Sequence, residues 1–290
     1  MQSGMAAYED RFWSSRDGLK LHFRDYAGGE GGKAPVVCLP GLTRNARDFE
    51  TLAERIAPER RVLCLDLRGR GDSEYAKDST NYVPAQYIDD LLVLLDQEGI
   101  ERFVSVGTSL GGLMTMGLAL FQPDRIAGAV LNDIGPVLEA AGLERIRDYV
   151  GQGRSFPTWV HAARAMEESQ AVAHPGQDLE FWLGIAKQRM TLGSNGRIVF
   201  DYDMKIAEPF AHFDTSAIPD MWPALDALAG RPLLFVRGAL SDILSAATLD
   251  EMVRRAPGSE AVTLPDVGHT PTLSEPAAEA AIDRLLARLD

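Results

Sequence analysis

A serine in a glycine-rich turn is the first residue of this sequence whose surroundings suit nucleophilic chemistry. The turn, residues 107–112, reads Gly-Thr-Ser-Leu-Gly-Gly and lies between an apolar strand-like run at 103–106 and a second apolar run at 113–116. A tight turn from strand to helix can hold a serine hydroxyl above the carboxyl edge of a parallel sheet, and small neighbours avoid clashes of Cβ atoms there. A serine in this position could also serve only as a helix cap. The pattern favours Ser109 as a nucleophile.

A serine hydroxyl needs a base that takes its proton, and the base needs a carboxylate that holds its tautomer. His269 lies in the loop 266–271, directly after a predicted buried strand, whereas the other four histidines lie in the N-terminal hairpin or between residues 136 and 219. Open α/β sheets build their sites at the carboxyl ends of their strands. We therefore predict His269 as the base.

Two aspartates follow predicted strands and could orient the histidine. Asp242 follows the strand at 233–236, and Asp133 follows the strand at 126–131. We prefer Asp242, because it lies between the serine and the histidine in the chain and directly before the strand that leads to His269. The alternatives are Asp133 as the acid and a helix-capping role for Asp242.

Charge that develops on a carbonyl oxygen needs hydrogen-bond donors that are already in place. The backbone N–H of Leu110, the first residue after the serine, is one expected donor. The second is the N–H of Leu42, in the loop after the apolar strand at 35–39, where Gly41 allows close approach of the backbone.

The elements that must position these residues alternate between strands and helices. After a hairpin at 11–26, buried strands are predicted at 35–39, 61–67, 103–106, 125–131, 232–236 and 261–264, and helices at 45–57, 84–99, 246–256 and 276–289. This alternation predicts a mostly parallel sheet covered on both faces. It stops between residues 136 and 219, where the sequence predicts a helical insertion with no clear buried strand.

Composition narrows the class of protein. The chain has 290 residues, 46% of them apolar, and a net charge of −13, which disfavours binding to nucleic acid or to an anionic membrane surface. Cys38 and Cys64 lie in apolar strands and are expected to be buried thiols. We see neither a signal peptide nor an apolar run of membrane-spanning length, so a cytoplasmic location is expected.

Five segments together resemble the α/β-hydrolase superfamily, and in particular its capped serine esterases, lactonases and carbon–carbon bond hydrolases. They are Pro40-Gly41-Leu42, the loop 66–73 with Asp66, Arg68, Gly69, Gly71 and Ser73, the serine turn, the loop 237–242 and Gly268-His269. Pro40 stands where many members have histidine, which we expect to change only how that loop is held.

The resemblance implies an α/β fold with an eight-stranded, mostly parallel sheet whose second strand is antiparallel. It implies a core domain of residues 1–135 and 220–290, with a helical cap at 136–219 inserted after the sixth strand. It also implies a site of Ser109, His269 and Asp242, without a metal or other cofactor.

The predicted function is the hydrolysis of a small to medium carboxylic ester or lactone through an acyl-serine intermediate. We expect Trp159, Trp182, Met204 and Phe210 to contribute to an apolar pocket, although such residues often only pack cap helices together. One alternative is a carbon–carbon bond hydrolase of vinylogous diketones; Thr270 after His269 disfavours it, whereas Arg164, Arg189 and Arg197 favour it. A ligand-binding receptor without activity is the alternative of another class.

Overall fold

A central sheet of eight strands forms the core of the computed structural model, which describes residues 8–29, 32–211 and 219–289. The strand order is β1-β2-β4-β3-β5-β6-β10-β11. The bounds are β1 Glu9–Ser14, β2 Lys20–Tyr26, β3 Val36–Leu39, β4 Val62–Asp66, β5 Phe103–Thr108, β6 Ile126–Asn132, β10 Leu233–Gly238 and β11 Glu260–Leu264. β2 is antiparallel to both of its neighbours, and the pairs from β4 to β11 are parallel. The predicted sheet is thus confirmed, including its antiparallel second strand.

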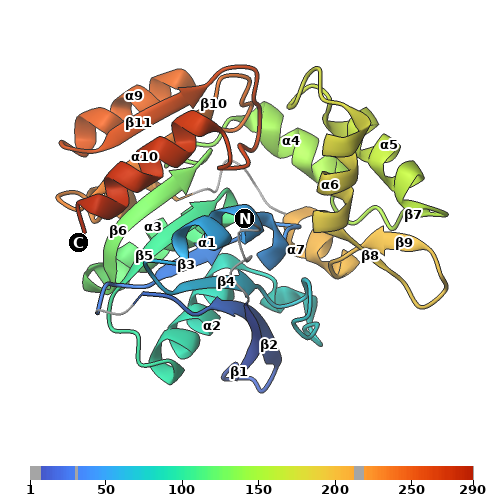
Figure 1. Cartoon of the computed structure of the whole chain (residues 1–290), viewed down its shortest axis with the longest axis horizontal. Helices are drawn as coiled ribbons and strands as arrows, with labels where there is room; N and C mark the ends of the chain where they lie inside the picture. The colour runs from blue at the N-terminus through green and yellow to red at the C-terminus, as the bar shows by residue number, and fades with distance from the viewer. Residues whose placement is uncertain (1–7, 30–31, 212–218, 290) are drawn as a thin grey trace, which may run out of the picture.

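Helices cover both faces of this sheet (Figure 1). They are α1 Glu50–Ile56, α2 Pro84–Gln97, α3 Leu110–Phe121, α8 Trp222–Asp226, α9 Ala246–Arg255 and α10 Pro276–Ala287. The residues of β3 alternate between two hydrophobic clusters: Val37 and Leu39 pack on the side of α2 and α3, whereas Val36 and Cys38 pack on the side of α1 and α10. This alternation is the reason why the strand reads as a continuous apolar run.

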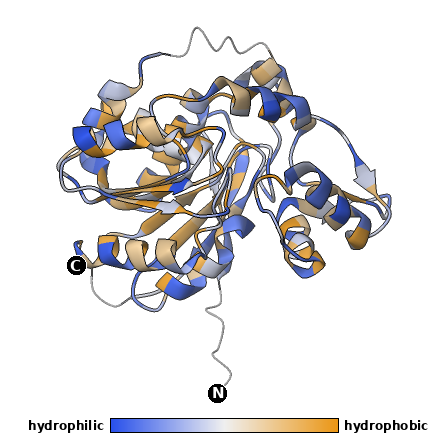
Figure 2. Ribbon diagram, turned by 90° about the horizontal axis from the view of Figure 1, so that it is seen from above, coloured by the Kyte–Doolittle hydropathy of each residue, from blue (hydrophilic) through white to orange (hydrophobic). Residues whose placement is uncertain are grey.

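The hydropathy colouring in Figure 2 shows the same arrangement, with apolar strands inside and helices that carry hydrophilic residues on their outer faces. Cys38 and Cys64 are buried free thiols, as expected. None of the described helices is long and apolar enough to cross a membrane.

The segment between β6 and β10 lies at one end of the sheet, in green to orange in Figure 1. It contains α4 Ala140–Tyr149, β7 Ser155–Phe156, α5 Trp159–Gln170, α6 Leu179–Arg189, β8 Met190–Leu192, β9 Ile198–Phe200 and α7 Ala207–Ala211. Residues 212–218, part of the predicted insertion, lie outside the described residues. The sequence predicts no clear buried strand here, whereas the structure has three short, mostly part-exposed strands, β7, β9 and β8, which form a small antiparallel sheet. Strands of two or three residues are too short to show alternation in the sequence.

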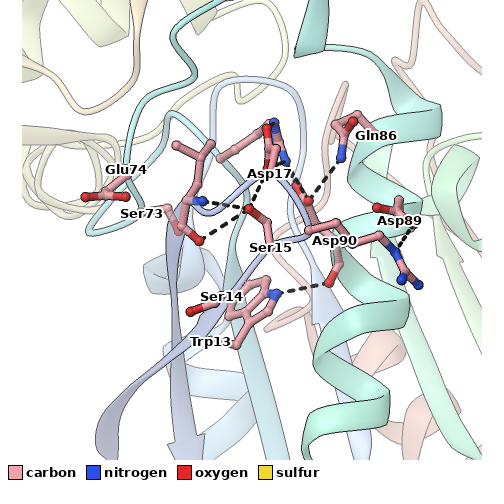
Figure 3. A network of polar contacts seen from close by, with 12 residues as sticks. Trp13, Ser14, Ser15, Asp17, Ser73, Glu74, Gln86, Asp89 and Asp90 are labelled. Atoms are coloured by element: carbon pink, nitrogen blue, oxygen red, sulfur yellow. Dashed lines mark hydrogen bonds and ion pairs between the residues drawn. The ribbon is translucent and has the colours of Figure 1, made fainter.

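A polar network joins the first hairpin to the helical layer (Figure 3). The indole of Trp13 donates to the carbonyl of Asp90 at 3.0 Å. The buried guanidinium of Arg68 bonds to the carboxylates of both Asp90 and Asp17, with its Nε 2.7 Å from Asp90 Oδ2. The loop after β4 is therefore fixed to α2 and to the turn between β1 and β2.

Candidate active site

Ser109 lies at the sharp turn between β5 and α3, in the left-handed region of the backbone with φ 51°. The glycines around it are required by close contacts. A Cβ on Gly107 would lie 2.5 Å from the carbonyl oxygen of Gly111, and a Cβ on Gly111 would lie 2.0 Å from the carbonyl oxygen of Leu39. Only glycine at these two positions lets the helix start this close to the strands, which presents the Ser109 side chain above the sheet edge.

The structure brings His269 to Ser109 from 160 residues away in the chain. Nε2 of the imidazole lies 3.0 Å from Ser109 Oγ. The histidine follows β11 in a loop that is held at two points: Asn132 Nδ2 donates to the carbonyl of Pro271 at 3.1 Å, and the N–H of Gly268 donates to the carbonyl of Ala173. The nucleophile and base that the sequence predicts are thus within hydrogen-bond reach of each other.

The carboxylate beside His269 belongs to Asp133. Its Oδ2 lies 2.8 Å from Nδ1 of His269 and accepts a second hydrogen bond from the hydroxyl of Ser241 at 2.7 Å. Oδ1 accepts from the N–H of Gly238 at 2.9 Å. Asp133 is completely buried at the end of β6. These bonds fix the carboxylate that lies against the imidazole, and Asp242 makes no hydrogen bond to either group.

Asp242 does not take the position that the sequence analysis gives it. Its carboxylate forms a bidentate pair with Arg145 of α4, in which Nη2 lies 2.8 Å from Oδ1. Burial acts to raise the pKa of Asp242, but the hydrogen bonds and charge of Arg145 outweigh it, so the pKa is lowered. The correction has a physical reason: the loop of Asp242 packs against α4, where the guanidinium takes the carboxylate. Of the two aspartates considered, Asp133 is the one at the histidine.

The two backbone groups expected to bind an oxyanion lie on either side of Ser109. Leu110 is the first residue of α3, so its N–H is one of those that a helix cannot satisfy internally. Gly41 lies beside the serine, since a Cβ on Gly41 would be 3.7 Å from Ser109 Cβ. Leu42 follows it, and both Leu42 and Ser109 line the cavities described below. The role of Leu42 and Leu110 as donors stays a prediction.

Arg70, which the sequence analysis does not single out, contacts the loop that contains Leu42. Its buried guanidinium donates from Nε and Nη2 to the carbonyl oxygen of Leu42, at 2.9 and 2.8 Å. The loop after β4 therefore braces the loop after β3. The sequence feature that could have indicated this contact is the loop 66–73, in which Arg70 lies between two glycines close to the expected sheet edge.

Two cavities of different character meet at Ser109. One, of about 240 Å³, is almost entirely apolar. Its wall includes Leu113 and Ile134 from the core and Leu143, Ile206 and Phe210 from the insertion. The other, of about 80 Å³, also has apolar side chains such as Ile146 and Phe156 in its wall, but it is called the polar cavity below because the wall includes His269 and several arginines. These are Arg44, Arg145, Arg154 and Arg189.

Of the four residues expected in the pocket, only Phe210 contributes to one of these two described walls. Trp182 is buried against His174 and Phe181, and Trp159 packs on the same small cluster inside the insertion. Met204 packs against the main core. For these three the expectation is not met: the two tryptophans fill the interior of the insertion and Met204 packs on the main core, and filling gaps between packed elements is a common role of methionine and aromatic residues.

Among the described residues, one group has the spacing of a metal site. Ligand atoms of Asp10, His22 and Asp72 lie within 4.8 Å of one another. His22 already uses both ring nitrogens, with Asp66 at 2.7 Å and with Asp10 at 3.0 Å. These contacts explain the cluster as a polar network at the start of the sheet.

Comparisons of this chain with a family model and with known proteins agree on one family. A family model described as alpha/beta hydrolase fold matches residues 34–276. The crystal structure of an alpha/beta hydrolase from Novosphingobium aromaticivorans DSM 12444 is similar to this chain with 63% sequence identity and a TM-score of 0.93, over 98% of this chain and 100% of that one.

Two curated relatives are also similar over most of their length. A 3-hydroxybutyrate-oligomer hydrolase from Cupriavidus necator is 37% identical over 249 residues, which are 83% of this chain and 84% of the relative. Esterase Rv0045c from Mycobacterium tuberculosis is 29% identical over 257 residues, which are 86% of this chain and 81% of the relative.

Proposed function

Since this chain belongs to the α/β-hydrolase fold family, we propose that it is a serine hydrolase that cleaves a small to medium carboxylic ester or lactone. The observation that supports this most is the row of hydrogen bonds from Ser109 through His269 to Asp133, with distances of 3.0 and 2.8 Å. Each residue in the row has the type and position that its role requires.

The reaction starts with attack of Ser109 Oγ on the ester carbonyl while His269 Nε2 accepts the hydroxyl proton. Asp133 holds the proton on Nδ1 and stabilises the imidazolium that forms. The backbone N–H groups of Leu42 and Leu110 bind the oxyanion. His269 then gives the proton to the departing alkoxide, which leaves an acyl-serine, and a water molecule activated by His269 releases the acid.

The relatives support ester cleavage. One is named a 3-hydroxybutyrate-oligomer hydrolase and another an esterase. The insertion at 136–219 acts in this proposal as a cap, because Leu143, Ile146 and Ile206 close the apolar cavity over Ser109. A small or medium acyl group fits such a surface.

Replacement of the serine tests the proposal. Ser109→Ala is expected to lower kcat for p-nitrophenyl butanoate by about 10⁴-fold or more, because the nucleophile is lost. Thermal unfolding and near-UV circular dichroism should show an intact fold. The matched control is Ser194→Ala, in the exposed turn after β8, which should keep full activity. Retained activity in Ser109→Ala would remove this serine from the mechanism.

Carbon–carbon bond hydrolysis with the same three residues is the second candidate. The observation in its favour is that Arg189 lies in the wall of the polar cavity, whereas Arg164 pairs with Glu167 and Arg197 bonds to Ser155. A comparison of turnover on vinylogous diketones and on esters separates the two. Rapid labelling of Ser109 by a fluorophosphonate separates either enzyme from a receptor.

A further inference from the structure

We propose, on the premise of the ester hydrolysis above, that the polar cavity binds a carboxylate carried by the leaving alcohol, and that Arg189 holds this carboxylate. The overall reaction then converts an ester R–CO–O–R′–COO⁻ and water into the acid R–COOH and the hydroxy acid HO–R′–COO⁻. The acyl–oxygen bond breaks, Ser109 holds the acyl group in between, and the hydroxy acid departs first.

The placement of Arg189 is the main evidence. It is the last residue of α6, its side chain lines the cavity together with Ser109 and His269, and only 6% of its surface is exposed. Nη1 donates to Oε1 of Gln170 at 2.6 Å, while Nε is buried with no hydrogen-bond partner. A guanidinium has five donor hydrogens arranged to fit a carboxylate, and in this side chain, which lines the cavity, at least one of them is unused.

No carboxylate of the described residues lies within ion-pair distance of Arg189, although other arginines of the cavity have one. Arg44 pairs with Asp48 at 3.0 Å, and Arg145 pairs with Asp242. A buried cation without a counter-ion is costly. A carboxylate in the cavity would offset that cost, which is why we assign the cavity to an anionic group.

The local electrostatics agree with an anionic ligand. Burial and the neighbouring charge of Arg44 lower the pKa of Arg189 to about 9, so the side chain is still protonated at neutral pH. Burial and the charges of Arg189 and Arg44 lower the pKa of His174 to about 3, so that imidazole is neutral and adds no charge. The charge of Asp48, which pairs with Arg44, acts on Arg189 in the opposite direction, so the positive charge of Arg189 is the one left without an ion-pair partner in this group.

The position of His269 decides which part of the ester enters the polar cavity. The imidazole must reach the leaving oxygen to protonate it. His269 is in the wall of the polar cavity, whereas the described wall of the apolar cavity contains Ser109 without the histidine. The leaving alcohol therefore lies in the polar cavity and the acyl group in the apolar one.

A pair of substrates that differ only in charge provides the test. 3-Butanoyloxybutanoate and 3-butanoyloxybutanamide have the same ester bond and nearly the same shape. For the wild-type enzyme, kcat/KM for the carboxylate should exceed that for the amide by about 10- to 100-fold, mainly through KM, because charged hydrogen bonds to a buried guanidinium are strong. Arg189→Met should reduce this ratio to near one, and Arg189→Lys should retain part of it.

The matched control is Arg164→Met, since Arg164 is exposed on α5 and pairs with Glu167; it should leave the ratio unchanged. A second measurement needs no variant: 3-hydroxybutanoate should slow fluorophosphonate labelling of wild-type Ser109 at concentrations at which 3-hydroxybutanamide has no effect.

Equal kcat/KM for the two esters, with hydrolysis that depends on Ser109, would overturn the carboxylate site and leave the ester hydrolase in place. An unchanged ratio in Arg189→Met would likewise overturn it. Hydrolysis that survives Ser109→Ala would instead overturn the proposed function.

Discussion

Asp133 is held by its backbone as well as by its carboxylate. Its N–H donates to the carbonyl of Val236 at 2.7 Å, and its φ of 54° directs the chain away at the end of β6. The carboxylate accepts hydrogen bonds from Gly238 and Ser241 besides the contact with His269. A group fixed in this way needs no rearrangement to stabilise an imidazolium, which is what preorganisation means for catalysis.

The two aspartates allow a direct test of this assignment. Asp133→Asn should lower kcat by about 10³- to 10⁴-fold, because an amide can no longer hold the required tautomer of His269. Asp242→Asn keeps the same shape and removes the charge that pairs with Arg145 and acts on His269 only through space, without a hydrogen bond to it, so kcat should fall less than about tenfold. Steady-state kinetics on one neutral ester measures both variants, and a larger loss in Asp242→Asn would contradict the assignment.

The sequence was sufficient to predict that Ser109 and His269 lie together, but not which aspartate lies beside the histidine. The serine is marked by its own neighbours, and the histidine by the strand before it. The strands that lead to Asp133 and Asp242 are adjacent in the sheet and end at the same edge, so chain order could not separate them. Asp242 is held away from His269 by its pair with Arg145, which lies 97 residues away in the chain. A local sequence pattern does not reveal so distant a contact.

At the scale of elements, Arg68 bonds to Asp17 and to Asp90, two residues labelled in Figure 3, and so fastens the first hairpin to α2. Hydrogen bonds from Arg68 lower the pKa of Asp17 from its ordinary value of 3.8 to about 2. A lowered pKa means that the folded state favours the carboxylate. The stabilisation is therefore fully present at pH values above the ordinary pKa and is lost as the pH falls toward the pKa of the folded state.

Asp17→Asn should reduce the free energy of unfolding by about 1 kcal/mol at pH 7, a modest value because the carboxylate is partly exposed. The difference from the wild type should shrink as the pH is lowered from about 4 to about 2. Urea unfolding at neutral pH and at two acidic pH values within this range measures it. Asp89→Asn, which affects only the exposed pair with Arg16, is the control and should change little. A difference for Asp17→Asn that persists undiminished in acid would contradict an origin in the charge of this carboxylate.

The elements of the sheet could be predicted because each strand has enough residues to show its pattern. The predicted helix at 84–99 corresponds to α2, and that at 276–289 to α10, with the ends moved by a few residues. The insertion could be recognised only as a break in the alternation. Its tryptophans looked like pocket residues because a sequence does not show which side of a small helical layer faces the cavity.

At the scale of the whole molecule, the core and the insertion together form the apolar cavity, in which we propose that the acyl group binds. Leu113 and Ile134 belong to the core, whereas Leu143 and Ile206 belong to the insertion. A change on either side should therefore alter the range of accepted acyl groups without changing the three reacting side chains.

Leu143→Phe should narrow the cavity from the side of α4. We expect kcat/KM for p-nitrophenyl octanoate to fall roughly tenfold relative to the acetate, because a pocket discriminates by a factor of about ten or more for a small change in fit. Initial rates over a series of acyl lengths measure this. Leu192→Phe, at an exposed position of β8, is the control. An unchanged profile in Leu143→Phe would mean that the acyl chain lies elsewhere.

Backbone hydrogen bonds join the insertion to the loop after β4, and this loop in turn contacts Leu42. Gly71 N–H donates to the carbonyl of Asp201 at 3.2 Å, and Asp203 N–H donates to the carbonyl of Gly69 at 2.8 Å, so Arg70 and Tyr202 face each other in a short bridge. The guanidinium of Arg70 in turn donates two hydrogen bonds to the carbonyl oxygen of Leu42. We therefore expect a shift of the insertion around a bound molecule to move the peptide of Leu42, which is the predicted oxyanion donor. Contacts that a substrate makes far from the scissile bond can in this way improve the alignment of the groups that act on that bond.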